Sequence, residues 1–595
     1  MCDSGDSERS APTRRHLLAA GAGATLGAAS GCLQRVRTLV DRPATDQLSL
    51  HIKTLPADAD EPATRIARSL ADRLEAVGIE ADITLLREDE LRRDVLTKGE
   101  FDVYVYRMPL GPDPDFLRAR LHSVFKGEPG WQNPFGITNI DLDEALDEQR
   151  RLASGARRTA VESVLETVAE LQPFVPVAVA DEISATRDET FGNWRPNGLD
   201  SPTGFLQLEA RESDPAGTLR VVGTDPRTVE SLNPIAAQFR DRGVVTGLLY
   251  EPLGRRVGEG VGPWLARDWE WDEEGADTTV RVRLREDLSW HDGESLTAED
   301  VAFTYRFLND TTLGDREATV PAPRYRGRTS LVADVEVASA DVVRLDVGDA
   351  TAEVGERALT VPILPRHVWR ERSNEAELAG VEVNERVTEA LVWDNREPIG
   401  SGPVAYGSRP NQETLVLERY DEHFLHRGVA DPPAESIAGG VDFETLQVRV
   451  APSSTAAVQL VVNGAADATV PMTAPDVVPQ IGQASDVTLR VGRSPWLYHV
   501  GFDTDVEVLG NPHVRRTIAR LLDKAWIVSE VLDGYGQPTP TPLAGTAWVP
   551  DDLAWDGTDP EVPFVGTEGD LDVRAARELF REIGFQYEDD RLLDR

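Results

Sequence analysis

The 595-residue chain has few lysines: only four of its 62 basic residues are lysines, which leaves 58 arginines. Aspartate and glutamate together number 103, so the net charge is −41. Such an acidic surface repels nucleic acid and anionic lipid, so neither is an expected partner. A surface dense in carboxylates and poor in lysine is typical of proteins that work in molar salt. The carboxylates stay hydrated there, and the salt screens their mutual repulsion beyond about 3 Å. We therefore predict a halophilic protein, with an ordinary acidic protein as the alternative.

Cysteine, long apolar runs and enzyme motifs are also scarce. The only cysteines are Cys2 and Cys32. Their spacing matches no cysteine metal-binding motif and indicates no disulfide. Beyond the N-terminal segment no run of about 20 apolar residues appears, so no spanning helix is expected. The HExxH, GxSxG and Walker A patterns are absent, which argues against a hydrolase. His423 and His426 lack a third ligand nearby, which favours a surface pair over a metal site.

Residues 1–31 have the pattern of an export signal. Arg14 and Arg15 precede an apolar stretch, residues 17–29, that is too short to span a membrane. Twin arginines in this position are typical of Tat signals. The stretch ends in Ala-Ser-Gly-Cys, which resembles a lipobox with Cys32 as the lipidated residue. We expect a protein anchored by lipid to the extracytoplasmic face of the membrane, with residues 32–47 as its tether.

The apolar pattern that follows predicts an α/β fold. Leu48–Ile52 alternate as a strand, residues 66–77 repeat at helical spacing, and Phe101–Tyr106 alternate again. This β-α-β order is typical of α/β proteins. A polar stretch with Pro and Gly, Glu209–Thr218, predicts a linker, and a new strand begins at Leu219.

The His291-Asp292-Gly293 triplet invites a catalytic interpretation. It follows an alternating strand, and Asp-Gly is a common turn dipeptide. It also precedes Thr297 and Asp300, whose spacing matches a capping box at the start of a helix. We predict a structural turn here rather than a catalytic group.

Several motifs occur in order along the chain: SLNPIAAQ (231–238), VTGLLYEPL (245–253), WHDGESLTAEDVAFTYRFL (290–308), PIGSGPVAY (398–406), NPHVRRTIARLLDKAWIVSEVLDGYGQPTPTPL (511–543) and VRAARELFREIGF (573–585). Together they resemble the family 5 extracellular solute-binding proteins, the receptors of peptide, nickel and related ABC importers. The resemblance implies an α/β fold, a two-lobed type II, cluster C-like periplasmic-binding-protein clamp with a third, smaller domain. It implies no catalysis, cofactor or metal.

The order of these segments differs from the family. Stretches that resemble the family's C-terminal part, among them GPDPDFL and LQPFVPVAVADEI, lie in residues 48–208, ahead of the part that resembles its beginning. The chain therefore resembles a circularly permuted member; the alternatives are a coincidental likeness of that region and an artefactual gene fusion. The predicted segments are the signal (1–31), the tether (32–47), the second lobe and return to the first (48–208), a linker joining the old termini (209–218), the start of the first lobe (219–250), the smaller domain (251–397), the first lobe (398–490) and the start of the second lobe (491–595).

The resemblance also implies the ligand site. Segments that line the cleft in the family contribute Asn233, Tyr250, Trp496, Tyr498, Tyr106, Arg107 and Asp113. Peptide-binding members carry W-x-x-D-x-x-D-P, whose first aspartate holds the ligand's amino group. The matching stretch here is RMPLGPDP, in which Arg107 replaces the tryptophan and Leu110 replaces that aspartate. These replacements weaken the assignment of a peptide ligand. If Arg107 points inward, a less cationic or an anionic ligand is indicated. Each aromatic residue could equally be core packing.

The expected function is capture of an oligopeptide or other small polar solute by closure of the lobes. The loaded receptor, a monomer, would then deliver the solute to the membrane subunits of an ABC permease. A surface sensor that uses the same clamp is the main alternative. An exported hydrolase or a purely structural surface protein is less favoured.

Overall fold

The computed structural model describes residues 47–211, 217–236, 243–257, 260–275, 277–376, 387–428, 437 and 439–594. The predicted signal, Cys32, the tether before residue 47 and residues 212–216 of the predicted linker lie outside these ranges. Gln47–Asp594 form one unit. Among the helices described in it, none is both long enough and apolar enough to cross a bilayer.

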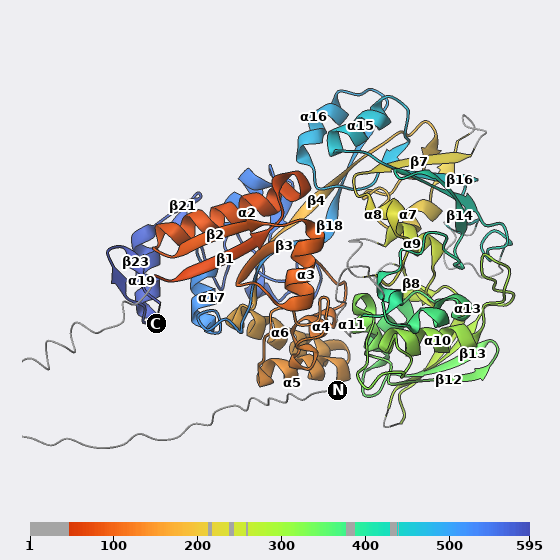
Figure 1. The fold of residues 1–595 in the computed structure, drawn as a ribbon, viewed down its shortest axis with the longest axis horizontal. Helices are drawn as coiled ribbons and strands as arrows, with labels where there is room; N and C mark the ends of the chain where they lie inside the picture. Colours follow the sequence, from red (N-terminus) through yellow and green to blue (C-terminus); the bar gives the residue numbers. More distant parts are fainter. Residues whose placement is uncertain are drawn as a thin grey trace, which may run out of the picture. The chain divides into compact units, whose positions relative to one another are not determined.

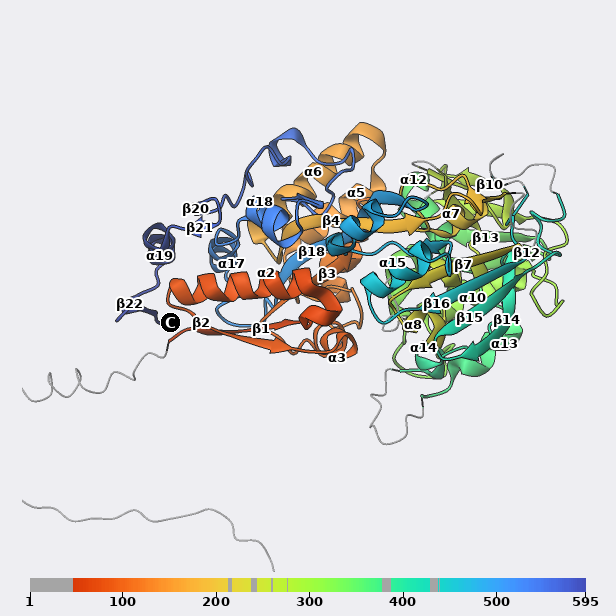
Figure 2. The same ribbon diagram turned by 90° about the horizontal axis from the view of Figure 1, so that it is seen from above.

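The first strands form the β-α-β unit that the apolar pattern predicts. β1 (Ser49–Thr54), α2 (Ala57–Ala76) and β2 (Glu80–Leu85) follow in order, and β1 pairs in parallel with β2 and with β3 (Val103–Pro109). Buried residues of α2 recur every three or four positions, so one helix face packs on the strands. Both ribbon views show α2 lying along β1 and β2 (Figures 1 and 2).

The main sheet has eleven described strands, in the order β14-β15-β16-β7-β17-β4-β18-β3-β1-β2, with β19 beside β4. Besides β1–β3, the strands of this sheet are β4 (Phe174–Thr186), β7 (Thr218–Gly223), β14 (Val404–Asn411), β15 (Thr414–Arg419), β16 (Thr445–Val450), β17 (Ala468–Thr469), β18 (Thr488–Phe502) and β19 (Gly536–Pro538). β7 pairs in parallel with β16 and β17, whereas β4 and β18 pair antiparallel. The sheet is therefore mixed, and the predicted α/β class is confirmed.

Two long strands, β4 and β18, connect the two parts of this sheet. β18 pairs with β3 on one side and with β4 on the other, and β4 reaches β17 through Thr186. We call the strands β1–β3 and the helices packed on them the β1 part, and β7 with β14–β17 and the elements sharing their core the β7 part. The pairing of β4 with β18 shifts register between Arg493 and Leu497, where Pro495 lacks an N–H for the ladder.

The side chains of β3 divide between two cores. Val103 and Val105 pack with α2, α17 (Pro512–Ala519) and α19 (Val573–Glu582). Tyr104 and Met108 point to the opposite face, because successive residues of a strand alternate between faces. The second core is completed by α4 (Phe116–Leu121), α5 (Ile140–Arg151) and α6 (Ser154–Leu171). The β1 part is therefore a sheet covered on both faces.

The β7 part contains a second, antiparallel sheet. Its strand order is β10 (Ala266–Asp272), β11 (Thr279–Leu284), β13 (Val342–Asp346) and β12 (Asp334–Ser339), with α10 (Ala298–Asn309) packed beside β12 and β13 (Figure 1). Buried residues of β11 and α10 belong to the same apolar cluster as those of β7, β15 and β16. The region predicted as the smaller domain therefore shares its core with the neighbouring sheet.

The remaining described helices are α3 (Glu88–Arg93), α7 (Pro202–Leu206), α8 (Arg227–Glu230), α9 (Val244–Leu249), α11 (Arg326–Thr329), α12 (Ala352–Gly355), α13 (Arg366–Trp369), α14 (Glu389–Val392), α15 (Ser454–Val462), α16 (Val478–Gly482) and α18 (Lys524–Trp526). Short strand pairs join β5 (Phe191–Gly192) to β6 (Glu209–Ala210), β8 (Gly254–Val257) to β9 (Gly260–Pro263), β20 (Gly566–Thr567) to β21 (Asp570–Leu571) and β22 (Tyr587–Glu588) to β23 (Arg591–Leu592). Because β6 takes residues 209–210 and β7 starts at Thr218, the linker is shorter than the predicted 209–218.

The His291 turn is structural, as predicted. The backbone N–H of His291 donates to the carbonyl of Gly400, and its ring lies 3.0 Å from the carbonyl of Gly402. The glycines are required here, because a Cβ at either position would lie 2.0 or 1.9 Å from a carbonyl oxygen of α9. The capping box of Thr297 and Asp300 is also confirmed.

The interpretation of His423 and His426 as a surface pair is wrong. His423 is 2% exposed and its Nε2 lies 3.1 Å from the carboxylate of buried Glu251. The His426 ring is half-buried and its Nε2 accepts from the N–H of Val441 at 3.0 Å. Spacing alone could not reveal this, because the partner of His423 lies far away in the chain.

The first and last described segments lie side by side. The N–H of Leu48 donates to the carbonyl of Leu592 at 2.8 Å, and the N–H of Leu592 donates to Gly78 at 2.8 Å. Gly78 has φ +91°, and a Cβ there would lie 2.2 Å from the carbonyl oxygen of Asp590. Leu48, Phe580 and Leu592 belong to one apolar cluster. The helix that ends near Phe585 and the strand that starts near Leu48 therefore share a core.

Candidate functional site

A cavity of about 570 Å³ lies where the β1 part, the β7 part and the break in β18 meet. The β1 part contributes Arg92, Leu110, Asp113, Phe116, Arg120 and Trp131 to its lining; the β7 part contributes Tyr250, Arg255, Arg256, Arg324, Tyr325, Arg328 and Arg357. Pro495 and Trp496 come from the break in β18. The volume falls within the range of sites for small molecules.

Local strand geometry explains why the cavity forms here. β3 ends opposite the break in β18, with Pro109 paired to Trp496, and the N–H of Leu110 donates to the carbonyl of Pro495 at 2.8 Å. Two prolines therefore end the ladder at the same point. β3 ends there, while β18 continues beside β4 alone, which leaves Leu110 and Trp496 together in the cavity wall.

Three residues predicted for the ligand site line this cavity: Tyr250, Trp496 and Asp113. Tyr250 is 1% exposed, and its hydroxyl accepts from the side chain of Asn395 at 2.7 Å. Asp113 pairs with Arg157 at 2.8 Å. Leu110, which replaces the aspartate of the peptide-binding pattern, also lies in the wall.

The other four predicted residues are not among those that line it. Asn233 is fully buried and donates to the carbonyls of Ala390 and Trp393 at 2.7 and 2.8 Å. Arg107 does not point inward: it alternates with Tyr106 on β3 and pairs with Asp60 at 2.9 Å. The Tyr498 hydroxyl donates to the same Asp60 at 3.0 Å.

Tyr106 lies behind the cavity wall and orients a residue that is part of it. Arg92 donates to the Tyr106 hydroxyl at 3.0 Å and pairs with Glu88 at 2.7 Å. Glu88 also pairs with Arg227 at 2.9 Å. Burial by itself raises the pKa of Glu88, but Arg92 and Arg227 outweigh it and hold the pKa at about 2.

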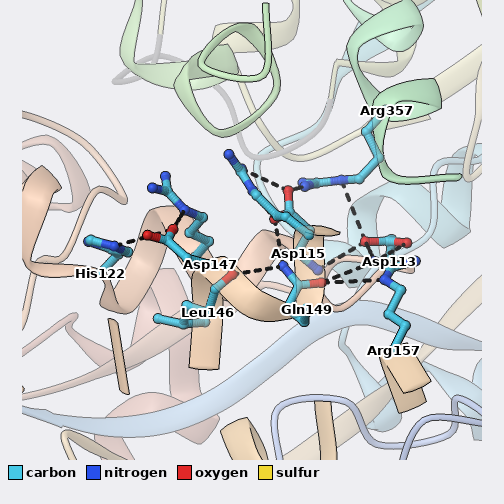
Figure 3. A network of polar contacts seen from close by, with 10 residues as sticks. Asp113, Asp115, His122, Leu146, Asp147, Gln149, Arg157 and Arg357 are labelled. Atoms are coloured by element: carbon cyan, nitrogen blue, oxygen red, sulfur yellow. Dashed lines mark hydrogen bonds and ion pairs between the residues drawn. The ribbon is translucent and has the colours of Figure 1, made fainter. Parts of the chain in front are cut away.

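A buried polar network joins the two parts beside the cavity (Figure 3). Arg357, from the turn Glu356–Thr360, donates to Asp115, which also accepts from Gln149 at 2.8 Å and from Arg150. Asp115 is fully buried. In Figure 3 Arg357 extends from the β7 part toward Asp113 and Asp115 of the β1 part. Arg157 adds a second bridge, from Asp113 to Glu353 at 2.6 Å.

A separate bridge joins the two parts next to residues of the cavity wall. Arg326 donates to both carboxylate oxygens of Glu128, at 2.8 and 3.0 Å, in the two-pronged geometry that favours arginine over lysine. The side chain of Gln132 donates to the carbonyl of Pro323 at 2.9 Å. With the Glu88–Arg227 pair, these contacts hold the two parts against each other around the cavity.

Sequence reasoning missed the arginines of the wall. Seven of the described arginines line the cavity, whereas the one arginine in the prediction, Arg107, lies elsewhere. No motif marks them, because they come from five separate segments of an arginine-rich chain. The lining that the structure describes offers guanidinium donors and aromatic faces and contains no histidine. Among the described residues, no group of three or more His, Cys, Asp or Glu side chains is arranged to hold a metal ion.

Residues 260–594, more than half of the chain, match the family described as "Bacterial extracellular solute-binding proteins, family 5 Middle". The chain belongs to this family. The family comprises substrate-binding receptors rather than enzymes. Membership confirms the predicted resemblance and the class of fold.

Relatives of this family 5 protein match it only in part. It is 26% identical over 271 residues to the oligopeptide-binding protein AppA of Bacillus subtilis, which covers 45% of the chain and 43% of AppA. Similar solved structures include an oligopeptide-binding protein of Thermotoga maritima with bound mannohexaose (21% identity, 63% and 64% of the two chains, TM-score 0.45). Another is NikZ of Campylobacter jejuni with Ni(L-His) (17% identity, 64% and 66%, TM-score 0.42). The chain thus spans less than two thirds of each of these relatives.

We expect Glu88→Gln to lower the free energy of unfolding by about 1–3 kcal/mol at pH 7, because the substitution removes a carboxylate bonded to two arginines. The folded pKa of about 2 lies below the ordinary value of about 4.3. The stabilisation is therefore complete above about pH 4.3 and is lost as the pH falls toward 2. Urea unfolding of both proteins at pH 7, 5 and 3.5 measures the difference.

The matched control is Glu578→Gln, whose side chain is 60% exposed. This change should alter stability by no more than about 0.5 kcal/mol at each pH. A difference between wild type and Glu88→Gln that stays constant down to pH 3.5 would contradict the assigned ion pairs.

Proposed function

We propose that this chain is the solute-binding receptor of an ABC importer. It captures an oligopeptide or other small polar solute and presents it to the membrane subunits of a permease. The observation that carries the proposal is the cavity between the β1 and β7 parts, bounded by both and bridged by ion pairs on two sides. Membership of a receptor family and the name of the relative AppA support it.

The proposed mechanism is closure about the two shared strands. β4 and β18 are the main-sheet strands between the parts, and their pairing is interrupted near Pro495, so bending there costs few ladder hydrogen bonds. A solute that contacts both walls favours the closed form only by its differential affinity. Moving the population from 1:99 to 99:1 closed requires about 5.5 kcal/mol of such difference.

We expect Arg357→Ala to favour the open form. Asp115 keeps its bond to Arg150, so the substitution removes the bridge without leaving that carboxylate unpaired. A thermal-shift screen of short peptides and small polar solutes identifies a ligand, and small-angle scattering then compares radii of gyration. The ligand should compact the wild type, and Arg357→Ala should bind it at least about tenfold more weakly, about 1.4 kcal/mol.

The control is Arg396→Ala, a substitution of an arginine whose side chain is 71% exposed. It should leave both compaction and affinity unchanged. If no solute in the screen binds or compacts the wild type, the receptor function is refuted.

We also propose export through the Tat pathway and anchoring by lipid on Cys32. The twin arginines, the short apolar stretch and the Ala-Ser-Gly-Cys sequence support this. In a halophilic host, Cys32→Ser should move the protein from the membrane fraction to the soluble exported fraction. Cys2→Ser, the matched control, should stay with the membrane. Equal distribution of the two variants would contradict the anchor.

We propose further that the chain is a circular permutation of the family order. The hydrogen bond between Leu48 and Leu592 and the core that both share with Phe580 support it. In the unpermuted order, the helix near Phe585 would lead through a short loop into the strand near Leu48. Chain ends that lie close together permit such a rearrangement.

A re-permuted chain tests this proposal. Asp594 is joined to Gln47 by a short Gly/Ser linker, and new ends are opened between residues 212 and 216. We expect the same far-UV circular dichroism and a free energy of unfolding within about 2 kcal/mol, because few contacts change.

In the control, the same joined chain is opened inside β4, between Val179 and Ala180, and it should fail to fold. If residues 48–208 fold by themselves when expressed alone, they are an independent domain and the permutation is refuted.

A further inference from the structure

The cavity wall has the opposite charge to the chain as a whole. The chain carries −41, yet among the described residues the wall contains seven arginines, two aspartates and no glutamate. Both aspartates already have cationic partners: Asp113 pairs with Arg157 at 2.8 Å, and Asp200 lies 3.9 Å from Arg195. They therefore neutralise little of the wall's charge.

Among the wall arginines that form no ion pair within the described structure, Arg120 is the most enclosed. It is 9% exposed, donates to the carbonyl of Pro109 at 2.7 Å, and lies over the rings of Phe116 and Trp131. Its Nε is buried and has no hydrogen-bond partner. Burial lowers the pKa of Arg120 to about 10, so the guanidinium is still charged at neutral pH.

Arg324 and Arg328 form a second cationic group, on the opposite wall. Both guanidinium groups lie over the ring of Tyr325, at 5.8 and 5.7 Å from its centre. Arg328 donates to the carbonyl of Thr360 at 3.1 Å, and Nη1 of Arg324 is buried without a hydrogen-bond partner. Within the described residues neither forms an ion pair. Burial, with smaller contributions from Arg324 and Arg256, lowers the pKa of Arg328, so these cations destabilise one another.

Buried charges without counter-charges are costly, and proteins normally pair them. An acidic chain has abundant carboxylates for this purpose, and the Arg357–Asp115 and Arg326–Glu128 bridges nearby show them in use. Among the described residues three wall arginines lack such a partner, and the coplanar donors of each guanidinium can bind two oxygens of one carboxylate or phosphate. From this arrangement we propose that the cavity takes an anionic solute, whose carboxylate or phosphate groups bind Arg120 on one wall and Arg324 and Arg328 on the other.

The inference rests on the proposed receptor function and specifies its ligand class. Citrate, inorganic phosphate and the peptides Glu-Glu-Glu, Ala-Ala-Ala and Lys-Lys-Lys serve as probes. Isothermal titration calorimetry is done on the full mature chain, at one fixed ionic strength at which circular dichroism shows it folded. At least one of citrate, phosphate and Glu-Glu-Glu should bind, whereas Ala-Ala-Ala and Lys-Lys-Lys should not. Comparing the affinity for citrate and phosphate with the affinity for Glu-Glu-Glu distinguishes a free anion from an acidic peptide as the ligand.

Arg324→Gln and Arg120→Gln should each weaken binding of the anion at least about tenfold. Arg324 is half-buried, so its variant tests the inference even if Arg120→Gln fails to fold. Arg396→Gln, at an exposed position, should bind like the wild type.

Binding of Ala-Ala-Ala or Lys-Lys-Lys as strong as that of the anions overturns the inference and leaves the receptor function intact. Anion binding that Arg324→Gln and Arg120→Gln do not weaken also overturns it. Failure of all five probes overturns the anionic ligand class, and the wider solute screen then decides the receptor function separately.

Discussion

The pairing of β4 with β18 is the interaction on which the rest of the structure depends. These two strands are the longest described in the main sheet, with 13 and 15 residues, and every route through the sheet from β1 to β7 crosses them. The ladder is regular at both ends and irregular near Pro495. The same irregularity ends the pairing with β3 and leaves Trp496 in the cavity wall. The irregular stretch of the β4–β18 ladder and the cavity therefore have one structural origin.

Arginine side chains make most of the internal electrostatic contacts in this lysine-poor chain. Arg157, Arg326 and Arg357 each connect segments far apart in sequence. The rigid, forked guanidinium can bond two acceptors at once, so a single side chain joins two elements. Within the part of the chain that the structure describes, Arg515, which is 2% exposed, bonds only backbone carbonyls, those of Leu171, Gln172 and Leu509. Carboxylates can thus remain on the surface while arginines satisfy buried acceptors.

Local patterns predicted the fold well and the cavity poorly. The alternation of β3, the helical repeat of α2 and the capping box at Thr297 depend on neighbouring residues, and the structure confirms each. The cavity depends on contacts between distant segments. Tyr250, Trp496 and Asp113 were found through motif resemblance, whereas Arg120 and Arg324 lie in no motif. Arg107, named through the same resemblance, lies opposite Tyr498 and pairs with Asp60, and the pairing of β3 with β18 that sets this cannot be read from one strand alone.

The position of residue 47 has a mechanical consequence. Gln47 precedes β1 directly and forms a bridge with Leu593, so whatever holds the chain before residue 47 holds the β1 part. A lipid at Cys32 would make the β1 part the stationary arm at the membrane. The β7 part, with its four-stranded sheet, would then be the arm that moves, joined to the stationary arm by the two shared strands and by the ion pairs beside the cavity.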